Sequence, residues 1–197
     1  MIKRISDIFI SIIGLILFSP ILILLSVFIY LEDHGKVFFV QSRVGLHGKL
    51  FKLIKFRTMT PTLNEKKNPI DLGIRSRVTH VGLILRKTKL DELPQLFNVL
   101  KGEMSIVGPR PEVPQFMEYY PEKWASVLRV KPGITDYASI EFRNEEEILI
   151  KSPNPQRTYI EEILPQKLHF YEKYEKEHNC ISDFKIILKT LYVTIFK

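Results

Sequence analysis

A long apolar run lies near the N-terminal end of the chain, from Ile8 to Leu31, and contains no charged residue. A straight helix of that length would reach about 36 Å, enough for the ~30 Å hydrocarbon core of a membrane. A secretory signal peptide fits less well, because its apolar region is about 7–15 residues long and ends at a small-residue cleavage site. The run therefore predicts a helix that stays in the membrane.

Physical arguments alone do not decide whether this helix spans the membrane or enters it and returns. Ser19 and Pro20 lie at its centre, and proline removes a helix hydrogen bond and bends the axis. Lys3 and Arg4 precede the run and a basic remainder follows it, so the positive-inside rule draws both ends to the cytoplasmic side. A helix broken at Ser19-Pro20 that dips in and returns satisfies both ends, whereas a single span satisfies one. Proline is tolerated in true spans, so neither path is excluded.

The pattern after the apolar run predicts one compact α+β domain that is mostly helical. Two runs with strand character flank Gly45 and Gly48, which indicates a small β-hairpin. Helical periodicity and turn signals then place further elements along the chain. The expected elements are strands at 36–43, 50–58 and 105–107, helices at 79–87, 92–100, 121–129 and 160–177, a loop at 60–71 and a turn at 131–133. We therefore expect a membrane-inserted helix at 1–31 and a catalytic domain at 32–197.

The C-terminal segment predicts a basic amphipathic helix. Its apolar residues follow i, i+3, i+4, i+7 spacing with Lys185 and Lys189 beside them, and they are Phe184, Ile187, Leu188, Leu191, Tyr192, Ile195 and Phe196. Such a helix can lie on an anionic membrane surface, or it can close the core of the domain. The apolar N-terminal run and the net charge favour the membrane.

Composition narrows the class of protein. The chain has 197 residues, a net charge of +7 and a single cysteine, Cys180, so it is not disordered, collagenous or held together by disulfides. It contains no GxxxxGK[ST] loop, no GxGxxG turn and no GxSxG elbow, which are the common signatures of nucleotide cradles and serine hydrolases. Binding of nucleic acid is disfavoured by the apolar anchor, although basic patches with aromatics can serve it.

Three charged clusters are candidates for chemistry. Lys55 and Arg57 are two residues apart on the expected second strand, so their side chains share one face. That face is either simply exposed to solvent or a binding site for phosphates. Asp91 and Glu92 stand where two expected helices meet, so Asp91 is either a helix N-cap or a carboxylate that attacks phosphorus. Arg110 lies between two prolines that fix the backbone, which suits either a rigid strand exit or an anion clamp.

These clusters belong to one ordered series of motifs. The series is Lys3-Arg4-x-x-Asp7, the apolar run with Ser19-Pro20, Lys55-Phe56-Arg57-Thr58-Met59, Thr79-x-x-Gly82-x-x-Leu85-Arg86, Leu90-Asp91-Glu92-Leu93-Pro94-Gln95-Leu96-x-Asn98-Val99-Leu100, Gly102-x-Met104-Ser105-x-Val107-Gly108-Pro109-Arg110-Pro111-Glu112 and Lys131-Pro132-Gly133-Ile134-Thr135. It strongly resembles the bacterial sugar transferases, the monotopic phosphoglycosyl transferases that begin glycan assembly on polyprenyl phosphate. The resemblance runs from residue 3 to about residue 135.

The resemblance implies a reaction and a site. Asp91 would attack the β-phosphate of a UDP-sugar, releasing UMP, and polyprenyl phosphate would then displace the phospho-sugar. Glu92 would assist Asp91 or a Mg²⁺ ion, and Asp91 would also contact that metal. Lys55, Arg57, Arg86 and Arg110 would bind phosphate.

The resemblance also implies a location. Ser19 and Pro20 would shape a re-entrant helix, which places the site at the cytoplasmic face of the bacterial inner membrane, among anionic lipids. A homodimer is compatible with the pattern, and nucleic acid is not an expected partner.

Departures and alternatives accompany the resemblance. The family's usual glycine after Ile-Thr is Asp136 here, and the stretch 169–174 lacks the acid-then-aromatics pattern of the family, so no acid is assigned from it. One alternative keeps the substrates but has the lipid phosphate attack directly, with Asp91 as a metal ligand only. Another is a basic peripheral membrane protein without catalysis, which leaves Asp91-Glu92 and Pro109-Arg110-Pro111 unexplained.

Overall fold

The computed structural model describes residues 2–60 and 77–196, and the loop expected at 60–71 lies outside them apart from Thr60. The chain forms two compact units. Unit 1 comprises Met1–Gln41 and Lys52–Gly102, and unit 2 comprises Ser42–Phe51 and Glu103–Lys197. A two-stranded sheet, β1 (Phe38–Val44) with β2 (Leu50–Phe56), confirms the expected hairpin. Each strand contributes residues to both units.

Unit 1 holds the apolar helix and the elements that follow the hairpin: α1 (Ile2–Asp33), α2 (His80–Thr88), a 3₁₀ turn η3 (Leu90–Glu92) and α3 (Gln95–Lys101). The expected helix at 79–87 is confirmed as α2, where the Thr79 hydroxyl accepts a hydrogen bond from the Gly82 amide at 2.9 Å. The helix expected at 92–100 begins later, at Gln95. Pro94 precedes it because proline fits the start of a helix, where no amide donor is needed.

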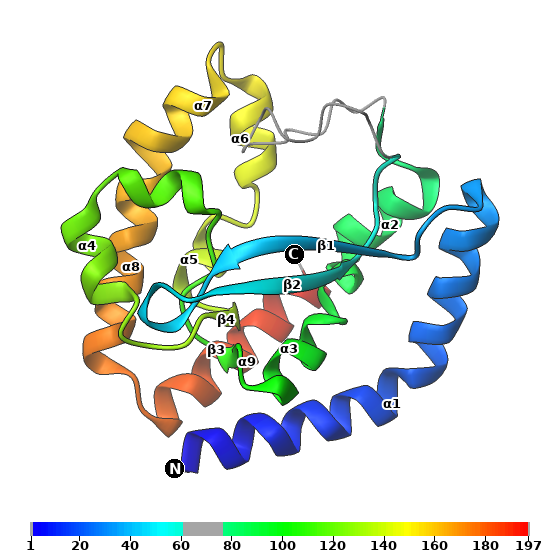
Figure 1. The fold of residues 1–197 in the computed structure, drawn as a ribbon, viewed down its shortest axis with the longest axis horizontal. Helices are drawn as coiled ribbons and strands as arrows, with labels where there is room; N and C mark the ends of the chain where they lie inside the picture. Colours follow the sequence, from blue (N-terminus) through cyan, green and yellow to red (C-terminus); the bar gives the residue numbers. More distant parts are fainter. Residues whose placement is uncertain (1, 61–76, 197) are drawn as a thin grey trace. The chain divides into compact units, whose positions relative to one another are not determined.

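Helix α1 is continuous from Ile2 to Asp33, and it bends along its length (Figure 1). The expected break at Ser19-Pro20 is not confirmed, because the backbone stays helical through both residues. Pro20 has no amide hydrogen for the carbonyl of Ile16, and the Ser19 hydroxyl donates to that carbonyl at 2.8 Å instead. Ser19 therefore compensates for the hydrogen bond that Pro20 removes. Within the described residues, α1 is the helix that is long and apolar enough to cross a membrane.

Both ends of α1 are fastened to the rest of unit 1. At the start, the Arg4 guanidinium donates to the carbonyls of Val99 (2.6 Å) and Leu100 (2.8 Å) near the end of α3, where helix carbonyls lack partners. At the other end, Asp33 pairs with Arg57 after β2. Between them, Ile29 is buried in a core that also contains Phe56 and Leu85.

Unit 2 is mostly helical around a second, parallel pair of strands. Its elements are the turn η1 (Leu46–Gly48), β3 (Ser105–Val107), η4 (Pro114–Glu118), α4 (Pro121–Val127), β4 (Gly133–Thr135), α5 (Tyr137–Glu141), α6 (Glu145–Lys151), α7 (Pro155–Thr158), the π-helical turn η5 (Tyr159–Ile163), α8 (Leu164–Glu177) and α9 (Cys180–Phe196). Strand β4 takes the place of part of the expected turn at 131–133, and its Gly133 pairs with Ser105. A side chain at position 133 would bring a Cβ to 2.1 Å from the Gly108 amide nitrogen, so only glycine fits there.

Helix α8 provides much of the core of unit 2 and packs against α4 and α5 (Figure 1). Leu164, Leu168, Tyr171 and Tyr174 are buried on it, and the expected helix at 160–177 is confirmed as η5 and α8. The C-terminal helix is confirmed as α9, which contacts β3, β4 and α5. Its buried apolar residue is Ile186, whereas much of the predicted stripe is exposed, namely Phe184, Leu188, Leu191, Tyr192 and Phe196. That stripe therefore does not close the core.

Candidate active site

Asp91 and Glu92 lie at a sharp reversal of the chain in unit 1. Helix α2 ends at Thr88, the next residue Lys89 has a left-handed backbone with φ of 58°, and η3 follows immediately. Both acidic residues are largely buried, with 9% of each residue exposed. Asp91 does not cap α3, because Pro94 occupies that position. Of the two interpretations of Asp91, the N-cap of the following helix is therefore not confirmed.

Lys55 brings a positive charge to this turn. Its Nζ donates to Glu92 Oε1 at 2.9 Å, and the exposed fractions of the two side chains are 17% and 11%. A partly buried ion pair of this kind is screened less by water than one at the surface. The structure therefore brings together three of the predicted site residues, Lys55, Asp91 and Glu92, on β2 and η3.

A buried amide fixes the strand that carries Lys55. Asn98 on α3 is fully buried, and its Oδ1 accepts from the Ile54 amide at 3.1 Å while its Nδ2 donates to the Lys52 carbonyl at 2.7 Å. The side chain thus bonds β2 on both sides of Leu53, as a neighbouring strand would. Sequence reasoning assigned Asn98 no role. No periodic pattern marked it, because Gln95 and Lys101 lie on the same face of the helix as Asn98.

Arg86 contacts Thr58, which follows Arg57 just beyond the end of β2. Arg86 Nε donates to the Thr58 hydroxyl at 3.0 Å, and the Thr58 carbonyl accepts from the Thr79 amide at 3.1 Å. Helix α2 approaches so closely that a Cβ at Gly82 would lie 2.2 Å from the Thr58 oxygen. The segment that follows Lys55 on the chain therefore holds the Arg86 side chain in place.

Arg57 is directed toward α1. Its Nη atoms bond both carboxylate oxygens of Asp33 at 2.5 Å, and its Nε donates to the Lys36 carbonyl at 2.5 Å. This two-pronged geometry is the strong form of an arginine–carboxylate pair. Arg57 is 7% exposed, and all three nitrogens of its guanidinium are engaged inside the protein. The contacts point to a structural clamp between α1 and β2, for which Asp33 was not predicted.

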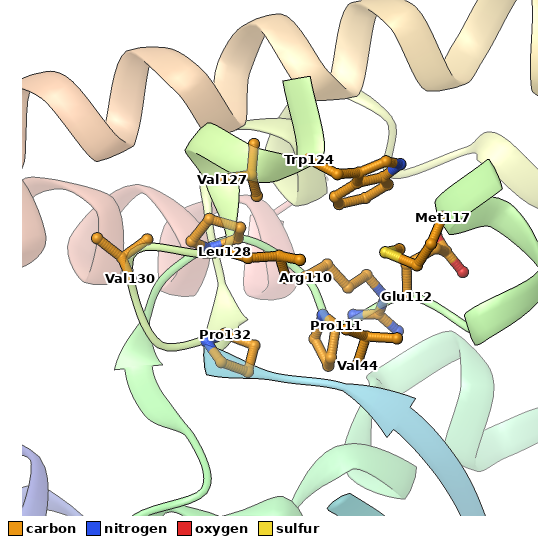
Figure 2. Close-up of a pocket in the computed structure, with 11 residues that line it drawn as sticks. Val44, Arg110, Pro111, Glu112, Met117, Trp124, Val127, Leu128, Val130 and Pro132 are labelled. Carbon is orange, nitrogen blue, oxygen red and sulfur yellow. The ribbon is translucent and has the colours of Figure 1, made fainter. Parts of the chain in front are cut away.

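Arg110 belongs to unit 2, where the segment 109–112 leaves β3. It lines a small cavity together with Trp124 and Val127 of α4 and Val44 at the end of β1 (Figure 2). Arg110 is half-buried, whereas Pro109 and Pro111 beside it are buried. Arg110 follows β3 after two residues, and its surroundings are compatible with both interpretations of the sequence. Arg110 is thus described within unit 2, and the carboxylates of Asp91 and Glu92 within unit 1.

Glu112 is the centre of a buried polar network in unit 2. Its carboxylate accepts from Arg43 at 3.1 Å, from the Val113 amide at 2.9 Å and from the Tyr159 hydroxyl at 2.5 Å. Lys167 Nζ approaches the Tyr159 hydroxyl at 3.3 Å. Burial alone would raise the pKa of Glu112, but the charges of Lys167 and Arg43 and these hydrogen bonds outweigh it and lower the pKa below its usual value.

Asp136 is fully buried at the start of α5. Its carboxylate accepts from the Ser139 amide at 2.7 Å and from the Ser139 hydroxyl at 3.0 Å, so it caps this helix. Burial raises the pKa of Asp136 above the usual value, although these hydrogen bonds oppose the shift. Burial also raises the pKa of Tyr171, which lies within the electrostatic reach of Asp136. The departure from the family at position 136 therefore places an acid in the core of unit 2.

The residues of the η3 turn fit a magnesium ion that is shared with a substrate. Among the described residues there is no group of three or more side chains of the metal-binding types. Mg²⁺ is commonly held through one or two carboxylates plus substrate phosphates, rather than by a cage of protein ligands. Asp91 and Glu92 supply two adjacent carboxylates, which is the donor set that such an ion requires.

Comparison with known proteins gives this geometry a context. The sequence profile of the bacterial sugar transferases matches residues 1–197. The exopolysaccharide production protein ExoY of Rhizobium meliloti is 40% identical over 160 residues, which cover 74% of this chain and 71% of the relative. The UDP-glucose:undecaprenyl-phosphate glucose-1-phosphate transferase of Escherichia coli is 37% identical over 201 residues, which cover all of this chain and 40% of the relative.

A third relative differs in the sugar that its name contains. The UDP-N-acetylgalactosamine-undecaprenyl-phosphate N-acetylgalactosaminephosphotransferase of Aeromonas hydrophila is 40% identical over 142 residues, which cover 71% of this chain and 34% of the relative. The profile match spans the whole chain, and it includes α1, the η3 turn and the segment with Arg110. This chain therefore belongs to the bacterial sugar transferase family.

Proposed function

We propose that this protein transfers a sugar 1-phosphate from a UDP-sugar to polyprenyl phosphate, which releases UMP and forms a polyprenyl diphospho-sugar. The observation that carries the proposal is the η3 turn, where buried Asp91 and Glu92 lie beside Lys55 in the same unit as an apolar membrane-type helix. Relatives named for undecaprenyl-phosphate sugar phosphotransfer support the substrates. The reaction would be the first membrane step of a glycan assembly pathway.

The chemistry proceeds in two displacements at one phosphorus atom. A carboxylate oxygen of Asp91 attacks the β-phosphorus of the UDP-sugar, and the bond from that phosphorus to the bridging oxygen breaks, so that UMP leaves with the electron pair. An oxygen of polyprenyl phosphate then attacks the same phosphorus and releases the Asp91 carboxylate. Both displacements add negative charge near Lys55, and cationic groups that are already in position stabilise such charge.

Glu92 and the arginines take supporting roles in this proposal. Glu92 orients Lys55 through their 2.9 Å ion pair and contributes a second carboxylate at the turn. Arg86 and Arg110 contribute positive charge for the phosphates, each held by its own unit. Asp91 and Glu92 would hold a Mg²⁺ ion, which would supply neutralisation of the diphosphate charge.

We propose that α1 enters the membrane and returns to the side it came from. Its first turn is fastened to α3 through Arg4, and its last residue is fastened to Arg57, and both partners lie in unit 1. A straight crossing would have to break one of these attachments. Helix α1 bends along its length and contains Pro20, and a proline inside a helix commonly bends the axis, which supports the same path.

The re-entrant path places residues 32–197 on the cytoplasmic face of the bacterial inner membrane. The exposed apolar stripe of α9, with Lys185 and Lys189 beside it, supports contact with anionic lipids on that face.

Intact-mass spectrometry tests the mechanism most directly. The detergent-purified protein is mixed with Mg²⁺ and a panel of UDP-sugars, with no lipid present. We expect a mass gain equal to one phospho-sugar for one donor and no gain in Asp91→Asn. Glu161→Gln is the matched control, because Glu161 is an exposed carboxylate paired with Arg157 in unit 2. The control should keep the gain.

The outcomes separate the mechanisms. Rates of UMP release should fall at least about 1,000-fold in Asp91→Asn, as is common when a nucleophile is removed. UMP release that requires polyprenyl phosphate, with no covalent adduct, would establish direct transfer and reduce Asp91 to a metal ligand. An Asp91→Asn variant with the full wild-type rate would overturn both assignments.

A further inference from the structure

An apolar groove of about 550 Å³ runs along α1 inside unit 1. One wall is the face of α1 that carries Leu22, Ser26 and Tyr30. The opposite wall comes from Phe56 on β2 and from Pro94 and Phe97 around the start of α3. None of the described residues that line the groove carries a charge. Its volume lies within the range of about 300–1,000 Å³ that is usual for small-molecule sites.

The groove lies beside the candidate active site in the structure of unit 1. Phe56 lies between Lys55 and Arg57 on the chain, and Pro94 follows Glu92 after one residue. The same short segments therefore present charge to the η3 turn and apolar surface to the groove. A ligand with an anionic head and an apolar tail would match this division.

The two serine hydroxyls in the lining of the groove are engaged with their own helix, and the other hydroxyl among its described residues belongs to Tyr30. The Ser26 hydroxyl donates to the Leu22 carbonyl at 2.7 Å, and the Ser19 hydroxyl donates to the Ile16 carbonyl at 2.8 Å. The serine hydroxyls are thus committed as donors, and the lining is suited to hydrocarbon rather than to a sugar, a nucleotide or the ester groups of a phospholipid.

The lining of the groove includes two aromatic rings from the β-hairpin, those of Phe38 and Phe56. The ring of Phe38 stacks on that of Phe56, with centroids 5.5 Å apart and an angle of 11° between the planes. Isoprene units contain planar trisubstituted double bonds, and these can lie against such a surface. Branched, flat units distinguish the chain of a polyprenyl lipid from a saturated acyl chain.

We propose that this groove binds the isoprenoid chain of the polyprenyl phosphate acceptor, in the units next to its phosphate. The inference rests on the proposed function, because that reaction brings a polyprenyl phosphate to Asp91. With the chain in the groove, the phosphate lies at the end formed by Phe56 and Pro94, next to Lys55 and the carboxylates of η3. The groove thus selects the acceptor and does not contact the UDP-sugar.

Filling the groove tests this assignment. Ser26→Phe adds an aromatic ring to the α1 wall, and we expect it to raise the KM for polyprenyl phosphate by about tenfold or more. The UMP released from the UDP-sugar in the absence of lipid should keep its wild-type amplitude and rate. Ser6→Phe is the matched control, because Ser6 lies on the same helix, also donates to its own helix and does not line the groove. It should change neither quantity.

A second variant guards against misfolding of the first. Phe97→Ala removes part of the opposite wall, and Phe97 is 43% exposed, so its truncation does not empty the core. It too should raise the KM for polyprenyl phosphate and leave the lipid-independent release of UMP intact. Unchanged KM values in both variants would overturn the groove assignment while leaving the proposed function in place.

A binding experiment separates this inference from the reaction itself. Farnesyl phosphate that carries a diazirine on its chain is photolysed with the wild-type protein in detergent, and labelled peptides are mapped by mass spectrometry. We expect labels on the peptides that contain Ser26 and Phe97, lost on addition of undecaprenyl phosphate and weaker in Ser26→Phe. Equal competition by phosphatidylglycerol would show a general lipid contact and overturn the proposal. Specific labelling without UMP release would instead contradict the proposed function alone.

Discussion

The two units use buried polar contacts in different ways. In unit 1, Arg57–Asp33, Arg4–Val99 and the Asn98 amide join separate elements and set the path of α1 and β2 around the η3 turn. In unit 2, Glu112 is surrounded by partners in the core. The comparison suggests that polar contacts in unit 1 mainly position reacting groups, whereas those in unit 2 mainly hold the fold.

The largest change in stability should follow from removing the charge at the centre of unit 2. Glu112→Gln removes the buried carboxylate that pairs with Arg43 and attracts Lys167, which keeps its own ion pair with Glu145, and we expect a loss of about 3 kcal/mol in the free energy of unfolding. Chemical denaturation at pH 7 measures it. Arg157→Ala, which breaks an exposed i,i+4 pair with Glu161, should leave the same quantity nearly unchanged, because water screens a pair at the surface.

The effect of Glu112→Gln should depend on pH. The pKa of Glu112 is lower in the folded protein than in the unfolded chain, so its contribution is present above the usual carboxyl pKa and lost as the pH falls through the folded value. The difference between wild type and variant should therefore shrink in acid. A constant difference from neutral pH down through the folded pKa would contradict a role for the carboxylate charge.

The contacts of unit 1 should affect the rate more than the stability. Asp33→Asn removes the charge from the Arg57 clamp, but the asparagine oxygen can still accept from the Arg57 guanidinium, and the Lys36 carbonyl keeps its bond to Arg57 Nε. We expect kcat/KM for sugar-phosphate transfer to fall by about tenfold, because a small displacement of Lys55 weakens its alignment with the reacting phosphate. The midpoint of thermal unfolding should move less than in Glu112→Gln. Equal activity with a large thermal shift would reverse the comparison.

The smallest expected effect is a gain in stability, which follows from removing the charge of Asp136. The pKa of Asp136 is raised by burial, so the unfolded chain loses this proton more readily, and stability is lost as the pH rises from the usual carboxyl pKa to the folded value. An asparagine side chain at this position can keep the cap on Ser139 without a charge. Asp136→Asn should therefore increase the free energy of unfolding by about 1 kcal/mol at pH 7 and have no effect below about pH 4. A loss of stability at pH 7 would show that the charge is needed.

Local patterns predicted the elements, but not the partners of their side chains. The hairpin and α2 follow from alternation, from glycines and from the Thr79 cap, which are signals within a few residues of each other. Strand β4 was missed, because Lys131-Pro132-Gly133 has the composition of a turn and its pairing with β3 is made across the fold. The start of α3 was misplaced because acids before Pro94 resemble an N-terminal turn.

The site shows the same division. The ordered motifs pointed to Asp91, Glu92 and Lys55, and the structure brings these residues together in unit 1. The ion pair between Arg57 and Asp33 could not be predicted, because the two residues lie 24 positions apart in the sequence. Local patterns do not show which basic residue binds a given carboxylate. Asn98 was hidden for the same reason, since its partners are backbone atoms of a distant strand.

The packing of Ile29 against Phe56 and Leu85 has a practical consequence for anyone who seeks a water-soluble fragment. Phe56 is 2% exposed and Leu85 is fully buried, and the cover over this cluster includes Ile29, Leu22 and Leu25 of α1. Deleting the first 31 residues would therefore expose apolar surface next to the strand that carries Lys55. The remaining polypeptide would tend to aggregate. Purification should keep the helix and use a detergent or nanodisc that replaces the bilayer around it.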